Sequence, residues 1–469
     1  MGKYYLAVDI GASSGRHILG HLENGKIKLE EIYRFENGMD HKDGKLLWNV
    51  DRLFGEILNG MKKCKELGKI PVSMAIDTWA VDYVLLDAQD RILGETYGYR
   101  DHRTDGMDAE TAKILQETEL YARTGIQKQV FNTVYQLMAV KQQTPELLQR
   151  AKTLLMLPDY FGFRLTGNKL SEYTNGSTTQ LVNPNTFQWD TDLIRKLGYP
   201  EDIFLPLQMP GTKVGQLLPE IQKEVGFNLE VVLCGSHDTA SAVMAVPQTS
   251  GDGIYISSGT WSLMGIESLK PIINEEAAAA NFTNEGGYDH RFRFLKNIMG
   301  LWMIQSVRHE YNDAYSFAQL CEMAEDSRDF PSRVDVNDPS FLSPDSMVEA
   351  IKKYCQKTGQ PVPESVGELA SVVYRSLAQS YGETVSSLEK IAGRTYDSIH
   401  IIGGGSNAAY LNQLTADATG KTVYAGPGEA TAIGNLLAQM IYAEELTDLK
   451  SARQCVRDSF EIKTFVPAK

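Results

Sequence analysis

The feature that most restricts the fold is a pattern of apolar strand, short loop of small residues and second apolar strand, which occurs twice in the chain. The first copy is YLAVDIGASSGRHILGHL (5–22) and the second is GIYISSGTWSLMGI (253–266). Glycines let the backbone turn its N–H groups toward one point, and serines add hydroxyl donors. The repetition predicts two halves of related architecture, with a coincidence between two ordinary hairpins as the alternative.

Turn residues and hydrophobic periodicity predict the neighbouring elements. Asn24-Gly25 predicts a type I′ turn into a third strand at 26–32. Apolar spacing predicts helices over about 108–165, and TPELLQRAKTLLMLPDYFGFRLTG (144–167) is expected to be one helix that ends at Gly167. Near the end we expect a helix at 364–392, a strand at 398–402, the loop GGGSN (403–407), a helix at 408–419 and a strand at 422–425. This alternation is typical of an α/β protein.

The length predicts more than one domain. At 469 residues the chain exceeds what one hydrophobic core usually supports. We expect an N-terminal domain at 1–245 and a C-terminal domain at 246–469, joined around residues 244–252, where AVPQTSGDG interrupts the pattern. The last helix is expected to pack back on the first domain.

Composition excludes several classes of function. The formal net charge is −14 and no basic block is present, which argues against nucleic-acid binding. The sequence contains no run of about 18 apolar residues, which a membrane helix would need, and its first residues lack the pattern of a secretory signal. We therefore expect a cytoplasmic protein. The five cysteines are scattered without C-x-x-C spacing, which predicts reduced thiols and no zinc site.

Three glycine-rich loops are candidates for holding phosphate. In the first, Ser13, Ser14, Gly15 and Arg16 can donate to phosphate oxygens, and Asp9 can hold magnesium, usually through water. A plain hairpin turn is the alternative for this loop taken alone. The loops SSGT (257–260) and GGGSN (403–407) provide two further devices of the same kind. Together they suggest a nucleotide held by both halves of the chain.

The segment SHDT (236–239) lies between a predicted strand and a predicted helix. Asp238 is a candidate base that accepts the proton of an attacking hydroxyl, a role that needs no raised pKa in phosphoryl transfer. A helix cap is the alternative role for Asp238. His237 is either a packed side chain or a donor to a sugar hydroxyl.

Ten motifs, in order along nearly the whole chain, resemble those of the FGGY carbohydrate kinases. They are DIGASSGR (9–16), DTWAVD (77–82), YRDHRT (99–104), PDYF with RLTG (158–167), EYTNGSTTQ (172–180), SHDTASAV (236–243), YISSGTWSLMG (255–265), NEGG (284–287), KNIMGLW (296–302) and GGGSN (403–407). The resemblance implies a duplicated actin-like, ribonuclease H-like ATPase fold, with two domains that flank a cleft for the nucleotide and the sugar.

The resemblance also implies roles for individual residues. Asp238 matches the catalytic base. The matching substrate contacts are Ala80, His237, Asp238, Thr239 and Asn297, and the matching nucleotide contacts are Ser13, Ser14, Gly15, Arg16, Thr260, Gln305 and Gly404. Ala80 departs from the family pattern, which has glycine there. If the sugar contacts the backbone, the added methyl group is tolerable when φ is negative; if a sugar carbon packs on this residue, the pocket is slightly smaller and the identity of the sugar is less certain.

The expected activity is ATP- and Mg²⁺-dependent phosphorylation of L-rhamnulose at its 1-hydroxyl, in L-rhamnose catabolism. L-fuculose and xylulose are alternative substrates within the family. A non-metabolic actin-like ATPase and a sugar-binding repressor are alternatives of other classes, although a repressor needs a basic helix-turn-helix extension. The expected partners are the sugar and ATP, without nucleic acid or membrane, and the protein is expected to be a monomer or a weak homodimer.

Overall fold

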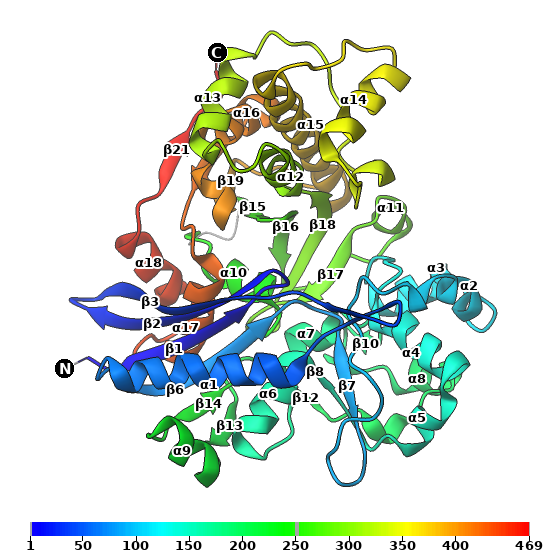
Figure 1. Ribbon diagram of the computed structural model, residues 1–469, viewed down its shortest axis with the longest axis vertical. Helices are drawn as coiled ribbons and strands as arrows, with labels where there is room; N and C mark the ends of the chain where they lie inside the picture. The colour runs from blue at the N-terminus through cyan, green and yellow to red at the C-terminus, as the bar shows by residue number, and fades with distance from the viewer. Residues whose placement is uncertain (1, 249–252, 469) are drawn as a thin grey trace. The chain divides into compact units, whose positions relative to one another are not determined.

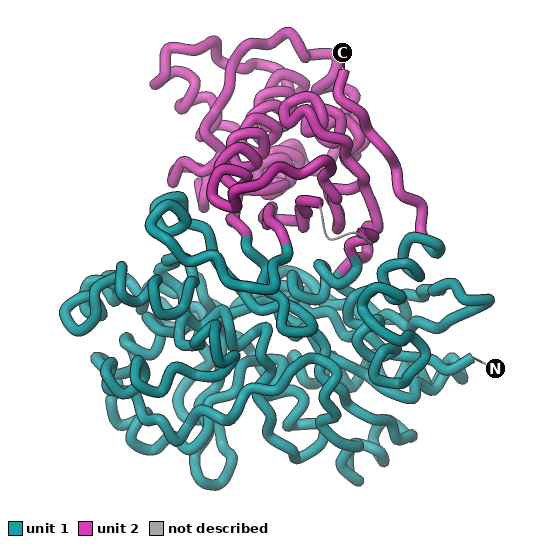
Figure 2. The backbone as a smooth tube through the Cα atoms, turned by 180° about the vertical axis from the view of Figure 1, so that it is seen from behind, with its two compact units in different colours: residues 1–245, 267–294, 431–459 teal, residues 246–266, 295–430, 460–469 magenta. Residues whose placement is uncertain are grey.

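The computed structural model describes residues 2–248 and 253–468 and divides into two compact units (Figures 1 and 2). Unit 1 comprises residues 1–245, 267–294 and 431–459, and unit 2 comprises residues 246–266, 295–430 and 460–469. The chain therefore returns to unit 1 twice after residue 245. Of the predicted junction at 244–252, residues 249–252 lie outside the described residues.

Unit 1 contains a six-stranded sheet in the order β13-β14-β6-β1-β2-β3. Its strands are β1 Tyr4–Ile10, β2 Ser14–Glu23, β3 Lys26–Glu36, β6 Pro71–Thr78, β13 Lys213–Gln216 and β14 Glu230–Val232. Strand β1 pairs antiparallel with β2 and parallel with β6. Asn24 and Gly25 have φ values of 52° and 76°, as a type I′ turn requires, so the predicted turn is confirmed.

Helices cover both faces of this sheet (Figure 1). Alternate residues of β1 point to opposite faces, so the two sets of side chains pack against different helices. On one face, Leu6 and Val8 belong to the same core cluster as helix α1 (Val50–Glu66). On the other face, Tyr5 and Ala7 pack with residues of helix α17 (Ala430–Tyr442). Burial on both faces explains why β1 is an almost continuous apolar run.

The prediction of a single helix at 144–167 is wrong, because this segment forms two helices with a strand between them. The structure has α5 Pro145–Arg150, then strand β8 Thr153–Met156, then α6 Leu157–Thr166. Strand β8 is fully buried and pairs antiparallel with β7 (Tyr83–Leu86), far away in the sequence. Pro158, in the first turn of α6, favours a new helix start there. The predicted end at Gly167 is confirmed by its left-handed conformation.

The other elements of unit 1 surround these strands. They are β4 Asp40–Lys42, β5 Lys45–Leu47, β9 Ser171–Glu172, β10 Val182–Asn183, β11 Gln188–Trp189, β12 Leu207–Gln208, α2 Met107–Ala112, α3 Glu117–Thr124, α4 Thr133–Gln143, α7 Tyr173–Ser177, α8 Thr191–Leu197, α9 Pro219–Val225, α10 Asp238–Met244, α11 Glu275–Ala279 and α18 Leu449–Ser459.

A second sheet repeats the strand pattern of the first. Its order is β17-β18-β16-β15-β19-β20-β21, with β15 Gly253–Ser258, β16 Trp261–Ser268, β17 Thr283–Gly286, β18 Phe292–Met299, β19 Ser398–Ile402, β20 Thr422–Ala425 and β21 Lys463–Phe465. Strand β15 pairs antiparallel with β16 and parallel with β19, as β1 does with β2 and β6. The two sheets therefore support a duplicated architecture.

The helices of unit 2 are α12 Trp302–Glu310, α13 Phe317–Asp326, α14 Met347–Lys357, α15 Val366–Ala392 and α16 Ala409–Thr419. The predicted helix at 364–392, the helix at 408–419 and the strands at 398–402 and 422–425 are confirmed within two residues. Among the described residues, no helix has the length and apolar character needed to cross a membrane.

Candidate active site

Asp238 is the first residue of helix α10, which begins beside the end of strand β6. Thr78 of β6 donates its N–H to the carbonyl of Ser236 at 2.9 Å, which joins the two segments. The Asp238 side chain is 34% exposed, and its Oδ1 accepts from the N–H and the hydroxyl of Thr239 at 2.6 and 3.2 Å. The cap residue of the helix is His237, whose side chain makes no capping bond, so the alternative of Asp238 as the helix cap is wrong.

The remaining oxygen of Asp238, Oδ2, has no hydrogen-bond partner in the described part of the chain. Desolvation by the surrounding protein raises the pKa of Asp238, although a third of the side chain is exposed, and the hydrogen bonds from Thr239 oppose that rise. A carboxylate with one engaged and one available oxygen can orient a hydroxyl group and accept its proton.

A buried glutamate fixes the segment before Asp238. Glu172 accepts from the hydroxyl and the N–H of Ser236 at 2.5 and 3.2 Å, and from the N–H groups of Thr174 and Asn175 at 2.7 and 3.0 Å. Asn175 in turn donates to the carbonyls of Trp79 and Ser236, both at 3.3 Å. Burial raises the pKa of Glu172, and its donors oppose this. The EYTNGSTTQ motif therefore holds two loops of unit 1 in place.

The first glycine loop connects β1 and β2 and places Asp9 opposite Arg16. The Arg16 Nη2 atom lies 2.6 Å from Asp9 Oδ2. The hydroxyl groups of Ser13 and Ser14 have no hydrogen-bond partner among the described residues, so they are available to a ligand. Gly15 is required sterically, since an added Cβ would lie 2.1 Å from the ring of Phe35.

Asp77 is a second carboxyl group at this place, in parallel register with Asp9. Its Oδ2 accepts from Asn435 Nδ2 at 2.6 Å, whereas its buried Oδ1 has no hydrogen-bond partner among the residues that the structure describes. Burial, with Asp9 and then Asp238 as like charges, raises the pKa of Asp77 well above its usual range. Three carboxyl groups of unit 1 therefore influence one another here.

Ala80 lies in a loop whose backbone is strained at the next residue. Val81 has φ = 67°, a left-handed conformation that β-branched residues rarely adopt, whereas Ala80 is not among the residues with positive φ. Asp82 holds this loop by accepting from the indole nitrogens of Trp48 and Trp79 at 2.6 and 2.9 Å. For a sugar contact through the backbone, the φ of Ala80 therefore allows its methyl group.

In unit 2, the predicted nucleotide contacts belong to segments that touch one another. Thr260 lies in the β15–β16 turn, and its carbonyl accepts from the N–H of Trp302 at 3.2 Å, at the start of the helix that carries Gln305. The glycine loop 403–405 packs on the same turn, since a Cβ on Gly405 would lie 2.0 Å from Ser258 Oγ. A Cβ on Gly404 would meet nothing within 4 Å, so this residue leaves open space.

Asn297, on β18, is the predicted substrate contact of unit 2. Its Oδ1 is buried and has no hydrogen-bond partner in the described ranges 2–248 and 253–468. A buried, unpaired amide oxygen is unfavourable unless a ligand satisfies it, which is consistent with a binding role.

Family models match both parts of the chain. The N-terminal domain of the FGGY family of carbohydrate kinases matches residues 4–245, and the C-terminal domain of this family matches residues 254–443. The chain belongs to the FGGY family of carbohydrate kinases. The resemblance found in the sequence motifs is thus confirmed.

Full-length relatives of this FGGY kinase are named rhamnulokinase. The protein from Halalkalibacterium halodurans is 54% identical over 99% of both chains. That from Oceanobacillus iheyensis is 51% identical, covering 99% of this chain and 98% of its own, and that from Bacillus subtilis is 46% identical, covering 99% and 95%.

Solved structures confirm the two-domain sugar kinase fold. A gluconate kinase from Lactobacillus acidophilus matches with a TM-score of 0.80 at 15% identity, covering 100% of this chain and 94% of the other. A Plasmodium falciparum glycerol kinase with ADP matches with a TM-score of 0.78 at 14% identity, covering 99% and 94%. At such identities the likeness concerns the fold alone.

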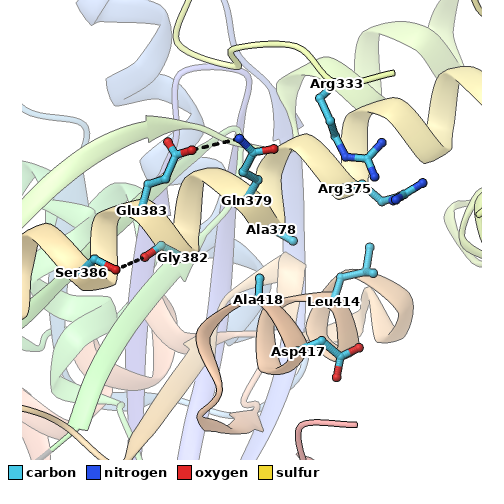
Figure 3. A pocket seen from close by; sticks show the side chains of 10 residues that line it. All are labelled: Arg333, Arg375, Ala378, Gln379, Gly382, Glu383, Ser386, Leu414, Asp417 and Ala418. Carbon is cyan, nitrogen blue, oxygen red and sulfur yellow. Dashed lines mark hydrogen bonds between the residues drawn. The ribbon is translucent and has the colours of Figure 1, made fainter. Parts of the chain in front are cut away.

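A groove of about 550 Å³ lies on unit 2 of this FGGY kinase (Figure 3). It is lined by α15, α16 and two arginines, Arg333 and Arg375. Arg333 donates to the carbonyls of residues 330–332, and Arg375 donates to those of Arg328 and Phe330. These arginines therefore fix a loop, and none of the predicted site residues lines the groove.

Proposed function

We propose that this FGGY kinase transfers the γ-phosphoryl group of ATP to the 1-hydroxyl of L-rhamnulose, in L-rhamnose catabolism. The choice of sugar rests on the full-length relatives named rhamnulokinase. The observation that carries the chemistry is Asp238, with Oδ1 held by Thr239 and Oδ2 available for a substrate hydroxyl. L-fuculose and xylulose are the alternative substrates within the family.

In the proposed reaction, the sugar oxygen forms a bond to the γ-phosphorus while the bond from that phosphorus to the β–γ bridging oxygen of ATP breaks. Asp238 accepts the proton of the sugar hydroxyl late in this step, because the transition state of phosphoryl transfer is loose. We assign Ala80, His237, Thr239 and Asn297 to the sugar. Ser13, Ser14, Gly15, Arg16, Thr260, Gln305 and Gly404 are assigned to the nucleotide.

The residues of unit 1 fit a hydrated magnesium ion. Asp77 Oδ1 is a buried carboxyl oxygen without a partner among the described residues, which suits a hydrogen bond with metal-bound water. Asp9 lies beside it in register and offers a second carboxylate. The described residues contain no group of three His, Cys, Asp or Glu side chains that could hold a metal by themselves. Mg²⁺ would neutralise phosphate charge, with Asp9 as its proposed protein partner, directly or through water.

The test is ADP production with ATP and Mg²⁺ across L-rhamnulose, L-fuculose, xylulose and no sugar. We expect L-rhamnulose to give the highest kcat/KM. Higher turnover with another ketose would refute the sugar assignment and leave the family intact. ATP consumption that no sugar stimulates would instead favour an actin-like ATPase.

The role of Asp238 is tested by Asp238→Asn. We expect kcat to fall by about 10² to 10⁴-fold, the usual contribution of acid–base assistance, while nucleotide binding is retained. Asp202→Asn, at an exposed position of unit 1, is the matched control and should keep wild-type kcat. Near-normal turnover of Asp238→Asn would show that this carboxylate is not the base.

We further propose a cytoplasmic protein that is a monomer or a weak homodimer. Its mass in solution, measured by light scattering over a range of concentrations, tests the second part of this proposal.

A further inference from the structure

A fully buried arginine lies behind His237, the neighbour of the proposed base. Arg293, at the start of β18, has no exposed surface. Its Nε donates to the carbonyl of Gly286 at 2.9 Å, and its Nη2 lies 3.0 Å from His237 Nδ1 in a hydrogen bond. Glu285 Oε2 lies 3.1 Å from the same Nη2 and 3.3 Å from His237 Nδ1. All of these residues belong to unit 1.

The charges within this cluster are balanced without a charged imidazole. Burial alone would raise the pKa of Glu285, but the charge of Arg293 opposes this, and the pKa is lowered, so the carboxylate is ionised. Arginine stays protonated in proteins. Glu285 and Arg293 therefore form a neutral pair, which reduces the cost of burying both charges.

The contact between Arg293 and His237 determines where the imidazole carries its proton. The guanidinium nitrogen can only donate, so Nδ1 of His237 must accept. A proton on Nδ1, in the other neutral tautomer or in the imidazolium ion, would place two donors against each other at 3.0 Å. Glu285 Oε2, 3.3 Å from Nδ1, could accept from such a proton, but the shorter contact with Arg293 favours the neutral imidazole with its proton on Nε2.

The Nε2 atom of His237 faces the proposed base. It lies 3.4 Å from Asp238 Oδ1, the same oxygen that accepts from Thr239. A fixed Nε2–H group is thus a donor beside Oδ1, for this oxygen or for a sugar hydroxyl. Either use leaves Oδ2 of Asp238 for the reacting hydroxyl.

We propose that Arg293, paired with Glu285, is a positioning residue that keeps His237 neutral with its proton on Nε2 and thereby fixes the orientation of Asp238. The kinetic part of this proposal rests on the proposed function of Asp238 as base. The tautomer of His237 is a property of the resting protein and does not depend on that function.

The first test measures the tautomer directly by ¹⁵N NMR of histidine-labelled protein, with His237→Asn to identify the resonances. In the wild-type protein we expect an unprotonated Nδ1 and a protonated Nε2 at pH 7. Arg293→Met should move the proton to Nδ1, where Glu285 can accept it, or give an imidazolium ion. A protonated Nδ1 in the wild type would overturn the proposal without any variant.

The second test is kinetic. Arg293→Met should lower kcat by about 10 to 100-fold, a smaller effect than loss of the base itself, with the KM for ATP unchanged. Arg293→Lys keeps the charge and one donor, so it should recover part of kcat and the Nε2–H form. Since Arg293→Met removes a buried charge and can fail to fold, the lysine variant and the wild-type spectrum keep the proposal testable.

The matched control is Arg123→Met, which removes another arginine–carboxylate pair of unit 1, with Asp190 at 2.6 Å. It should lower stability and leave kcat and the His237 spectrum unchanged. If Arg293→Met keeps the wild-type tautomer and a kcat within about twofold of Arg123→Met, Arg293 has only a structural role. If the wild type shows no sugar-dependent turnover, the proposed function fails while the spectrum still decides the role of Arg293.

Discussion

Asp82 allows a quantitative prediction about the loop that carries Ala80. Its side chain is 2% exposed and accepts four N–H groups. Oδ2 accepts from Trp48, Trp79 and the backbone of Tyr99 at 2.6, 2.9 and 3.0 Å, and Oδ1 accepts from Gln136 at 2.9 Å. Burial nevertheless raises the pKa of Asp82 from 3.8 to about 6, against the effect of these donors.

The sign of the pH dependence follows from the raised value. A carboxyl group with a higher pKa in the folded state contributes stability below its unfolded pKa and loses it as the pH rises through the folded pKa. The full loss from pH values below 3.8 to values above 6 is about 3 kcal/mol, and the part between pH 5 and pH 8 is about 1.4 kcal/mol.

Asp82→Asn removes this titration. The amide of asparagine would oppose the Gln136 donor, a cost of about 1 to 3 kcal/mol that does not depend on pH. The variant is therefore expected to be less stable than the wild type at pH 5, and this difference should shrink by about 1.4 kcal/mol at pH 8.

Urea unfolding of both proteins at pH 5, 6, 7 and 8 measures this difference, with Asp202→Asn as an exposed control. The transition of unit 1 must be resolved, since a two-unit chain need not unfold in one step. Native fluorescence provides a second readout, because Trp48 and Trp79 both donate to Asp82 and should report a midpoint near pH 6. A stability difference that stays constant or grows with pH would refute the reasoning and show that the four donors outweigh burial.

Three further predictions concern the same unit. Val81→Gly removes a backbone strain of about 1 to 3 kcal/mol and should raise the KM for the sugar severalfold by loosening the loop, as steady-state kinetics will show. Gly434→Ala places a Cβ 1.7 Å from the carbonyl oxygen of Ser241 on α10, so it should lower both the melting temperature and kcat. The control is Gly55→Ala, whose Cβ would meet nothing within 4 Å and which should lower neither. Glu172→Gln offers an N–H₂ group where a carboxylate oxygen accepts, and should lower kcat by about 10-fold while the KM for ATP is kept.

Sequence predicted best those parts of the fold that local residues determine. Asn24-Gly25 specified its turn because both positions need positive φ, and Gly167 ended its helix for the same reason. The strand at 153–156 was missed because a short buried apolar run suits either a helix or a strand. It is a strand because it pairs with β7, which is far away in the sequence.

In the candidate site, too, local sequence indicates some residues and not the partners that are distant in sequence. Asp238 and His237 are candidates from the sequence because they are adjacent and lie between a predicted strand and a predicted helix. The partners that hold the site were missed because they are distant in sequence. Glu172 lies 64 residues from Ser236, Arg293 lies 56 residues from His237, and Asn435 lies 358 residues from Asp77. No local pattern contains such pairs, and only folding reveals them.

The buried carboxyl groups of unit 1 explain why Asp238 is the one suited to act as a base. Hydrogen-bond donors surround Glu172 and Asp82, Arg293 neutralises Glu285, and burial raises the pKa of Asp77 well above its usual range. Each of these four is below 6% exposed and committed to a neighbour or to a proton. Asp238 alone in this set combines partial exposure with an oxygen that no described residue engages. Among these five carboxyl groups, Asp238 is therefore the one whose surroundings best fit the proposed role of base.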